Sequence, residues 1–130
     1  MSAPVIYRPL SEGERCLIEG MILTAPNHSV AAALDIDSLI RSLRHAKVTE
    51  MADGDMGSLL FAAKDSTEIR HFGGRLCEAE FLDSDGMGLS IVVIIDQNQE
   101  LYELDIFKGD FSALVRLPKI SEVIRVRYTD

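Results

Sequence analysis

The residues of this sequence best placed to do chemistry lie in an alternating acidic and apolar run, ELYELDIFKGDF, at residues 100–111. Closely spaced carboxylates can bind a metal ion or act as a general acid and base. The same alternation is typical of a β-strand with one buried and one wet face, because successive side chains point to opposite faces. The charged residues of the run are Glu100, Glu103, Asp105, Lys108 and Asp110.

Residues 74–83 alternate in the same way, with Cys77, Ala79 and Phe81 on one face of a predicted strand. If strand 88–95 lies between the two acidic strands, their carboxylates share one outer face, about 10 Å apart across two strand spacings. That distance is too wide for one shared proton or one metal ion unless long side chains close it. These carboxylates, which we call the acidic row, are Glu78, Glu80, Glu103 and Asp105.

Catalysis, partner contact and plain solvation are the three interpretations of the acidic row. Carboxylates about 5 to 10 Å apart can hydrolyse glycosides, but only beside a sugar-binding cleft. Aromatic platforms for such a cleft are scarce, because the chain has no Trp and only 6% aromatic residues. Arg125 and Arg127 share one face of the C-terminal strand and could pair across strands with Glu103 and Asp105. We expect a solvated or ion-paired face that a partner could contact.

Neither a calcium loop nor a metal-binding histidine pair is predicted. The turn at residues 83–86, DSDG, is similar to part of an EF-hand loop. That loop needs an oxygen ligand at position 81 and an acid at position 92, where Phe81 and Val92 stand. The three histidines lack the spacing of a helical metal site. We therefore expect a hairpin turn at residues 83–86 and neither a metal nor a cofactor.

A pocket between helices and sheet is the alternative site. Its nucleophile would be Cys77, with His71 on the other side of Phe72-Gly73-Gly74. A reactive thiol needs an electropositive setting, yet Glu78 follows Cys77. Two adjacent glycines at a strand start more often mark a bulge or a sharp bend. The residues of this alternative pocket are His45, His71, Cys77 and Tyr102.

Two helices are predicted ahead of the strands. Ser11 and Glu14 have the spacing of a capping box, and apolar residues follow at helical intervals until Pro26, so the first helix should span residues 12–24. The second apolar stripe is Ile36, Leu39, Ile40 and Leu43. Whether Val30–Leu34 belongs to this second helix is left open.

From Val48 onward the apolar period becomes two, which predicts strands. Short turns between them imply antiparallel neighbours. The expected fold is α+β, with two N-terminal helices packed on one face of an antiparallel meander of five to six strands, in a single domain over residues 1–130. Strand 88–95 is apolar on both faces and should be central. The predicted strands are 47–52, 58–63, 74–83, 88–95, 100–107 and 122–128.

Composition and charge narrow the partners. The chain has 130 residues and a formal charge of −8, which disfavours nucleic acid and anionic membranes and would favour a basic partner. The N-terminus lacks the basic start and apolar stretch of a secretory signal. The two cysteines, Cys16 and Cys77, form no C-x-x-C pair and are expected as buried thiols in a reducing compartment. We expect a cytoplasmic protein that contacts neither nucleic acid nor membrane.

Four segments together resemble a widespread small bacterial domain of unknown function. They are RPLSEGERCLIEGM, LIRSLRHAKV, EAEFLDSDGMGLSIVVII and ELYELDIFKGDFSALVRLP, and they span most of residues 8–118. The resemblance implies an N-terminal helical pair followed by a small sheet, and no established activity, substrate or cofactor. Similar small acidic domains accompany bacterial toxin systems as antagonists. The connection at residues 24–35 is longer here than in the family pattern.

The acidic surplus and the lack of a nucleophile–base arrangement favour a non-catalytic protein-interaction domain with an acidic surface. Its partner would be a basic protein, such as a cationic toxin, or a second copy of the chain. Self-association could cover the outer apolar residues of strand 88–95. The alternative function is a small-ligand-binding protein or a small hydrolase that uses the pocket between helices and sheet.

Overall fold

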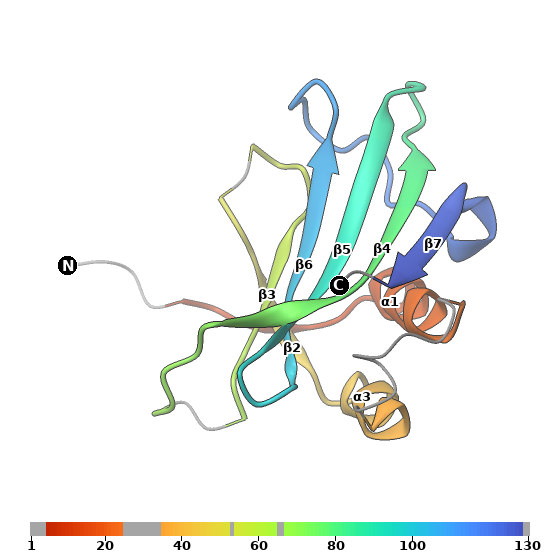
Figure 1. Cartoon of the computed structure of the whole chain (residues 1–130). Helices are drawn as coiled ribbons and strands as arrows, with labels where there is room; N and C mark the ends of the chain where they lie inside the picture. The colour runs from red at the N-terminus through yellow and green to blue at the C-terminus, as the bar shows by residue number, and fades with distance from the viewer. Residues whose placement is uncertain (1–4, 25–34, 53, 65–66, 129–130) are drawn as a thin grey trace.

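The structure of the chain is a computed structural model that describes residues 5–24, 35–52, 54–64 and 67–128. Within these ranges two α-helices accompany a seven-stranded antiparallel sheet, which is an α+β fold (Figure 1). The elements are β1 (Arg8–Pro9), α1 (Glu12–Thr24), α3 (Ile36–Ser42), β2 (Lys47–Glu50), β3 (Leu59–Phe61), β4 (Phe72–Leu82), β5 (Gly88–Asp96), β6 (Leu101–Lys108), the 3₁₀ helix η1 (Ile120–Glu122) and β7 (Arg125–Tyr128). The open question about Val30–Leu34 lies outside the described residues.

Helix α1 begins at the capping box that the sequence predicts. The backbone N–H of Glu14 donates to Ser11 Oγ at 3.1 Å, and that of Ser11 donates to Glu14 Oε1 at 2.8 Å. These bonds satisfy N–H groups that have no partner within the helix. Helix α3 is capped by Asp35, whose Oδ1 accepts from the N–H of Ser38 at 3.0 Å. Both helices therefore start where local side-chain chemistry places them.

The sheet corrects the expected strand number and order. Its order is β1-β2-β3-β6-β5-β4-β7, so seven strands replace the expected five to six. Strand β1 was not predicted, because two residues are too few to show alternation. Only β4, β5 and β6 form a meander. Strand β3 pairs with β6, so β4, the next strand along the chain, lies beyond both β6 and β5, and β7 pairs with the other edge of β4.

A single hydrophobic cluster joins both helices to one face of the sheet. Helix α1 contributes Leu17, Ile18, Met21 and Ile22, and α3 contributes Leu39. Gly20 lets α1 approach η1, because a Cβ at this position would lie 2.7 Å from Ile120 Cγ1. The sheet residues of the cluster include Cys77, Ala79 and Phe81 of β4, Leu89, Ile91, Val93 and Ile95 of β5, and Leu104 and Ile106 of β6.

The start of β4 is irregular, as the adjacent glycines predict. The register between β4 and β5 shifts between Phe72 and Gly74. A Cβ at Gly73 would lie 1.9 Å from the carbonyl oxygen of Asp96. Only glycine allows the two backbones to approach so closely.

A buried ion pair closes one end of the meander. Nζ of Lys108 donates to Asp83 Oδ2 at 2.8 Å, to Asp85 Oδ2 at 2.6 Å and to the carbonyl oxygen of Ala113 at 3.0 Å. The side chains of Lys108 and Asp83 are 1% and 0% exposed. An ammonium group has three donors, so every donor of Lys108 is used.

Asp83 is satisfied as fully as Lys108. Its carboxylate also accepts from the backbone N–H groups of Ser84, Val115 and Arg116, at 2.7, 2.8 and 3.2 Å. Burial alone would raise the pKa of Asp83, but the Lys108 ammonium and these N–H donors outweigh it, and the net pKa falls to about 2. The network ties the β4–β5 turn to the end of β6 and to the loop that follows β6.

A second buried ion pair closes the opposite end. Nε of Arg70 donates to Asp96 Oδ2 at 2.8 Å, and its Nη1 donates to the carbonyl oxygen of Phe61 at 2.7 Å. Oδ1 of Asp96 accepts from the N–H groups of Asn98 and Glu100 in the β5–β6 turn, at 2.8 and 3.0 Å. This arrangement holds that turn and links Arg70, just before β4, to the end of β3.

Replacing Lys108 with Met should destabilise the fold strongly, because the carboxylate of Asp83 would stay buried without its cation. We expect the melting temperature to fall by about 10 °C or more. The control Lys119→Met changes an exposed lysine and should shift it by about 2 °C or less. Thermal unfolding followed by circular dichroism measures both. Equal melting temperatures for the two variants would contradict the role of the buried pair.

Asp83 should also make stability depend on acid pH. Its pKa is about 2 in the folded chain against an ordinary value of 3.8, so the unfolded chain binds more protons in this range. Stability is therefore complete above about pH 4 and falls as the pH drops towards about 2. Urea unfolding at stepped pH should show this loss in the wild type and a shallower slope in Asp83→Asn. Parallel pH profiles for the two proteins would refute the assignment.

Candidate functional site

The acidic row lies on the face of β4, β5 and β6 opposite the core, which we call the outer face. Strand β5 separates β4 from β6, so Val92 pairs with Glu78 on one side and with Asp105 on the other. Ile94 likewise pairs with Arg75 and Glu103. The carboxylates of the row are partly exposed. The register thus agrees with the spacing predicted from the period of two, in which facing carboxylates stand two strands apart.

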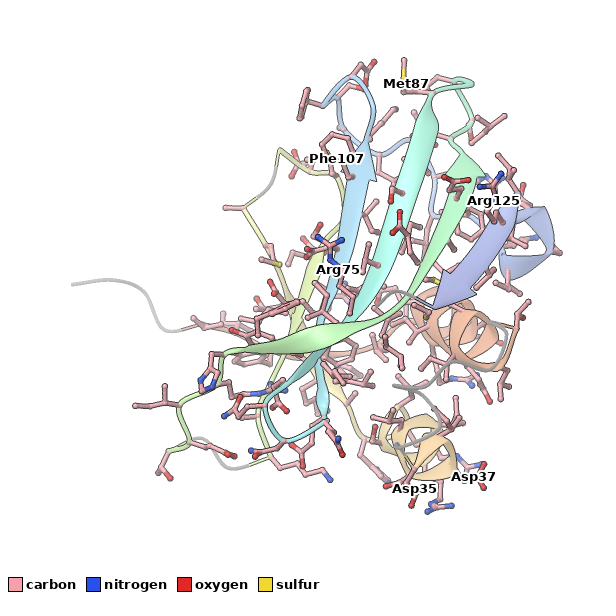
Figure 2. The ribbon with its side chains drawn as sticks, viewed as in Figure 1. Asp35, Asp37, Arg75, Met87, Phe107 and Arg125 are labelled. Carbon is pink, nitrogen blue, oxygen red and sulfur yellow. The ribbon has the colours of Figure 1, made fainter. Side chains whose placement is uncertain are left out.

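Positive and polar groups neutralise part of the acidic row. Ser90 Oγ donates to Glu78 Oε1 at 3.0 Å, and Arg125 Nε lies 3.8 Å from Glu80 Oε2. Figure 2 shows Arg75, Phe107 and Arg125 on the side of the sheet turned towards the viewer. Burial, and then the charge of Asp105, raise the pKa of Glu103 above its ordinary value. The row is therefore a half-buried and partly compensated set of charges.

The predicted pairing of Arg125 and Arg127 with Glu103 and Asp105 is wrong. Strand β7 lies beside β4, so Arg125 is opposite Glu80 and Arg127 is opposite Glu78 in the register. The expectation failed because it placed the C-terminal strand next to β6, whereas β3 occupies that edge. Glu103 and Asp105 therefore lie on an inner strand, away from β7.

An exposed apolar patch adjoins the acidic row on the outer face. Leu82, Phe107 and Ile124 are 58%, 47% and 59% exposed. They line a shallow hollow of about 330 Å³ together with Glu80 and Ser90. Phe111 extends the patch, because its ring stands edge-on to that of Phe107 with the centroids 5.1 Å apart. The apolar patch is thus Leu82, Phe107, Phe111 and Ile124.

Sequence reasoning missed this patch although a signal was present. In the period of two, Leu82 and Phe107 fall on the same face as Glu80 and Asp105. Large apolar residues at positions expected to be wet indicate a surface that something else covers. Ile124 could not have been assigned in this way, because its closeness to β4 depends on the backbone bond from its N–H to the Glu80 carbonyl oxygen.

The residues of the alternative pocket do not line one cavity together. Of these four residues, His45 alone lines the cavity of about 580 Å³ that lies beside α3. Tyr102 lies under the Arg70 guanidinium, 4.9 Å from its ring centroid, and His71 is exposed just before β4. Cys77 faces the core, where burial raises the pKa of its thiol to about 12. A thiol with that pKa is protonated near neutral pH and is a poor nucleophile.

Among the described residues, no group of three or more His, Cys, Asp or Glu side chains is arranged to hold a metal ion. In the same part of the chain, no helix is both long enough and apolar enough to cross a membrane.

Fold and outer face together define a small α+β domain that presents an apolar patch beside a row of carboxylates. A family model described as a domain of unknown function, DUF6984, matches residues 7–118, and the chain belongs to this family. The resemblance seen in the sequence is thereby confirmed. Of the apolar patch, only Ile124 falls outside the matched residues. A search of curated proteins gave no match, and a search of solved structures gave none either.

The expectation of two buried thiols is wrong for Cys16, which is exposed on α1, whereas Cys77 is buried. The two cysteines should therefore differ sharply in reactivity. We expect a disulfide exchange reagent at about pH 8 to titrate one thiol quickly in the folded chain and the second only after denaturant is added. Cys16→Ser should abolish the fast phase and leave the slow one. Two fast thiols in the wild type would show that the β4 core position is accessible and would reopen Cys77 as a reactive residue.

Proposed function

We propose that this chain is a non-catalytic protein-interaction domain whose outer face binds a cationic polypeptide segment carrying apolar side chains. The observation that carries the proposal is the contact between the exposed apolar patch and the acidic row on one rigid sheet face. In this proposal the two helices cover one face of the sheet and leave the opposite face for the partner.

The apolar patch would supply most of the binding free energy. Fully burying one Leu or Phe side chain contributes about 1.5–3 kcal/mol relative to leaving it exposed, and aromatic side chains are common anchors of interfaces. Phe107 is held on the central β6 strand beside the buried Lys108 network. Because the backbone at this position is already fixed, little conformational entropy would be lost on binding.

The acidic row would select a positively charged partner and speed its encounter. A net charge of −8 gives the whole chain a field that attracts cations. Complementary charges at an interface act mainly on the association rate and on specificity, and salt screens them. Within the acidic row, Glu103 and Asp105 lie farthest from β7, which pairs with the far edge of β4.

A different protein is a better occupant of this face than a second copy of the chain. A two-fold dimer would bring the same surface together from both copies, so each acidic row would meet like charges. Two chains of −8 would also repel each other over a longer range. A cationic toxin-like protein or another basic segment would avoid both kinds of charge repulsion. The two free cysteines are compatible with a cytoplasmic location.

Loss of the apolar patch should abolish partner binding. The wild type, immobilised and exposed to an extract of its native cells, would yield candidate proteins for identification by mass spectrometry. Each purified candidate would then be titrated against Phe107→Asp and against the control Ile69→Asp, which changes an exposed apolar residue outside the patch. We expect a loss of about 100-fold for Phe107→Asp and less than about twofold for the control.

The charges should act differently from the patch. Glu103→Lys with Asp105→Lys should lower the association rate about tenfold and flatten its dependence on salt. The control pair Glu12→Lys with Asp37→Lys changes the net charge equally at exposed helix positions. Equal binding by the wild type and Phe107→Asp would reject the outer face as the interface. A concentration-dependent dimer that Phe107→Asp dissolves would replace the basic partner with a second copy.

A further inference from the structure

A second surface of the chain carries slightly more basic than acidic side chains. A cleft of about 580 Å³ opens between α3, the segment that leads into β2, the segment that follows β3, and the β5–β6 turn. Its volume falls within the usual range for small-molecule sites. Apart from His45 and Glu100 it shares no residue with the sites considered from the sequence, and it shares none with the hollow on the outer face.

The floor of the cleft is apolar. Leu39 of α3, Phe61 of β3 and Leu101 of β6 line it, and these side chains are only 3–6% exposed. They belong to the hydrophobic core, so the floor is held in place by the packing of three separate elements. A ligand with an apolar body could lie against this preformed floor.

The rim carries three arginine or lysine side chains and one histidine. Arg41 and His45 come from the end of α3 and the turn after it, Lys47 begins β2, and Lys64 follows β3. No hydrogen bond or ion pair links the side chain of Arg41 or Lys47 to another residue in the described ranges. Arg41 and Lys47 are thus two unengaged cations beside an apolar floor, in a chain with 21 acidic and 13 basic residues.

The two carboxylates of the cleft already have partners. Asp35 caps α3 through the N–H of Ser38, and Glu100 lies 3.4 Å from Lys64 Nζ. In the part of the chain that the structure describes, neither carboxylate forms an ion pair with Arg41 or Lys47. Hydroxyl and amide groups of Ser42 and Asn98 complete the rim. The positive charge of Arg41 and Lys47 is left to face solvent beside the apolar floor.

We propose that this cleft binds a small organic oxyanion, a carboxylate or phosphate attached to an apolar body. Arg41 and Lys47 would hold the anionic head, with Arg41 able to donate two parallel hydrogen bonds. Leu39, Phe61 and Leu101 would contact the apolar body. The site is independent of the outer face, so a ligand here and a protein partner there could bind to one molecule at the same time.

Three probes with one ring system test the proposal. They are 1-naphthyl phosphate, 1-naphthaleneacetate and the neutral 1-naphthalenemethanol, each titrated into the ¹⁵N-labelled chain and followed by amide chemical shifts. We expect at least one of the two anions to shift the amides of Leu39, Ala62 and Leu101 in a saturable way. The neutral alcohol should bind at least about tenfold more weakly. Comparison of the two anions shows which head group the cleft prefers.

Charge variants locate the site. Arg41→Glu with Lys47→Glu should weaken binding of the preferred anion at least about tenfold. The control Arg44→Glu with Lys119→Glu makes the same charge change at exposed positions outside the cleft and should change affinity less than about twofold. Arg41→Gln with Lys47→Gln serves as a second pair, with a smaller perturbation of the fold. Phe107→Asp should leave anion binding unchanged, which separates this site from the outer face.

Several results would overturn the proposal. They are no saturable shift with either anion, equal affinity for the neutral alcohol, equal weakening by the control pair, and shifts centred on β4 and Phe107. Failure of anion binding would leave the outer-face interaction standing, because the two sites are probed by different ligands and different variants.

Discussion

The buried contact between Lys108 and Asp83 is the constraint on which the outer face depends. A charge removed from water is tolerated only if its partners replace the lost hydration. Here the Lys108 ammonium group uses all three of its N–H donors. The Asp83 carboxylate accepts from Lys108 and from three backbone N–H groups. The β4–β5 turn, the end of β6 and residues 113–116 are therefore held by one network.

That network also explains why an aromatic side chain can stay exposed. Lys108 points into the structure at the end of β6, so its neighbour Phe107 must point to the outer face. The loop after β6 returns close by, and it brings Phe111 against the Phe107 ring. The apolar patch is thus the outer side of the same turn whose inner side holds the ion pair.

A similar buried ion pair lies at the other end of the meander. Asp96 and Arg70 play there the part that Asp83 and Lys108 play near β4, with the carboxylate again accepting turn N–H groups and one cation. This second pair holds the β5–β6 turn, whose residues form one wall of the cleft beside α3. Each of the two proposed binding surfaces therefore rests on a turn that a buried aspartate organises.

The sequence predicted the parts of this structure that local patterns determine. Helix α1 follows from its capping box, both helices follow from their apolar stripes, and the face of each carboxylate in the acidic row follows from the period of two. Strand order did not follow, because the pairing of β3 with β6 and of β7 with β4 depends on contacts between distant segments. Lys108 shares the parity of the inward residues Leu104 and Ile106, so its burial could have been inferred. The cleft could not, since it exists only where α3 meets the β5–β6 turn.

The pairing of β7 with β4 has a consequence for how the chain is made. Among the described strands β4 is the longest. Along the edge of β4 that faces away from β5, the described residues that pair with it are 125–128. During synthesis this edge leaves the ribosome well before β7 does. By then β5 and β6 can already pair on the opposite side of β4. A nascent chain therefore passes through a stage with an unprotected row of backbone N–H and C=O groups. Rapid pairing of β7 with β4, or binding of a chaperone to this edge, would limit mispairing between neighbouring nascent chains on one messenger RNA.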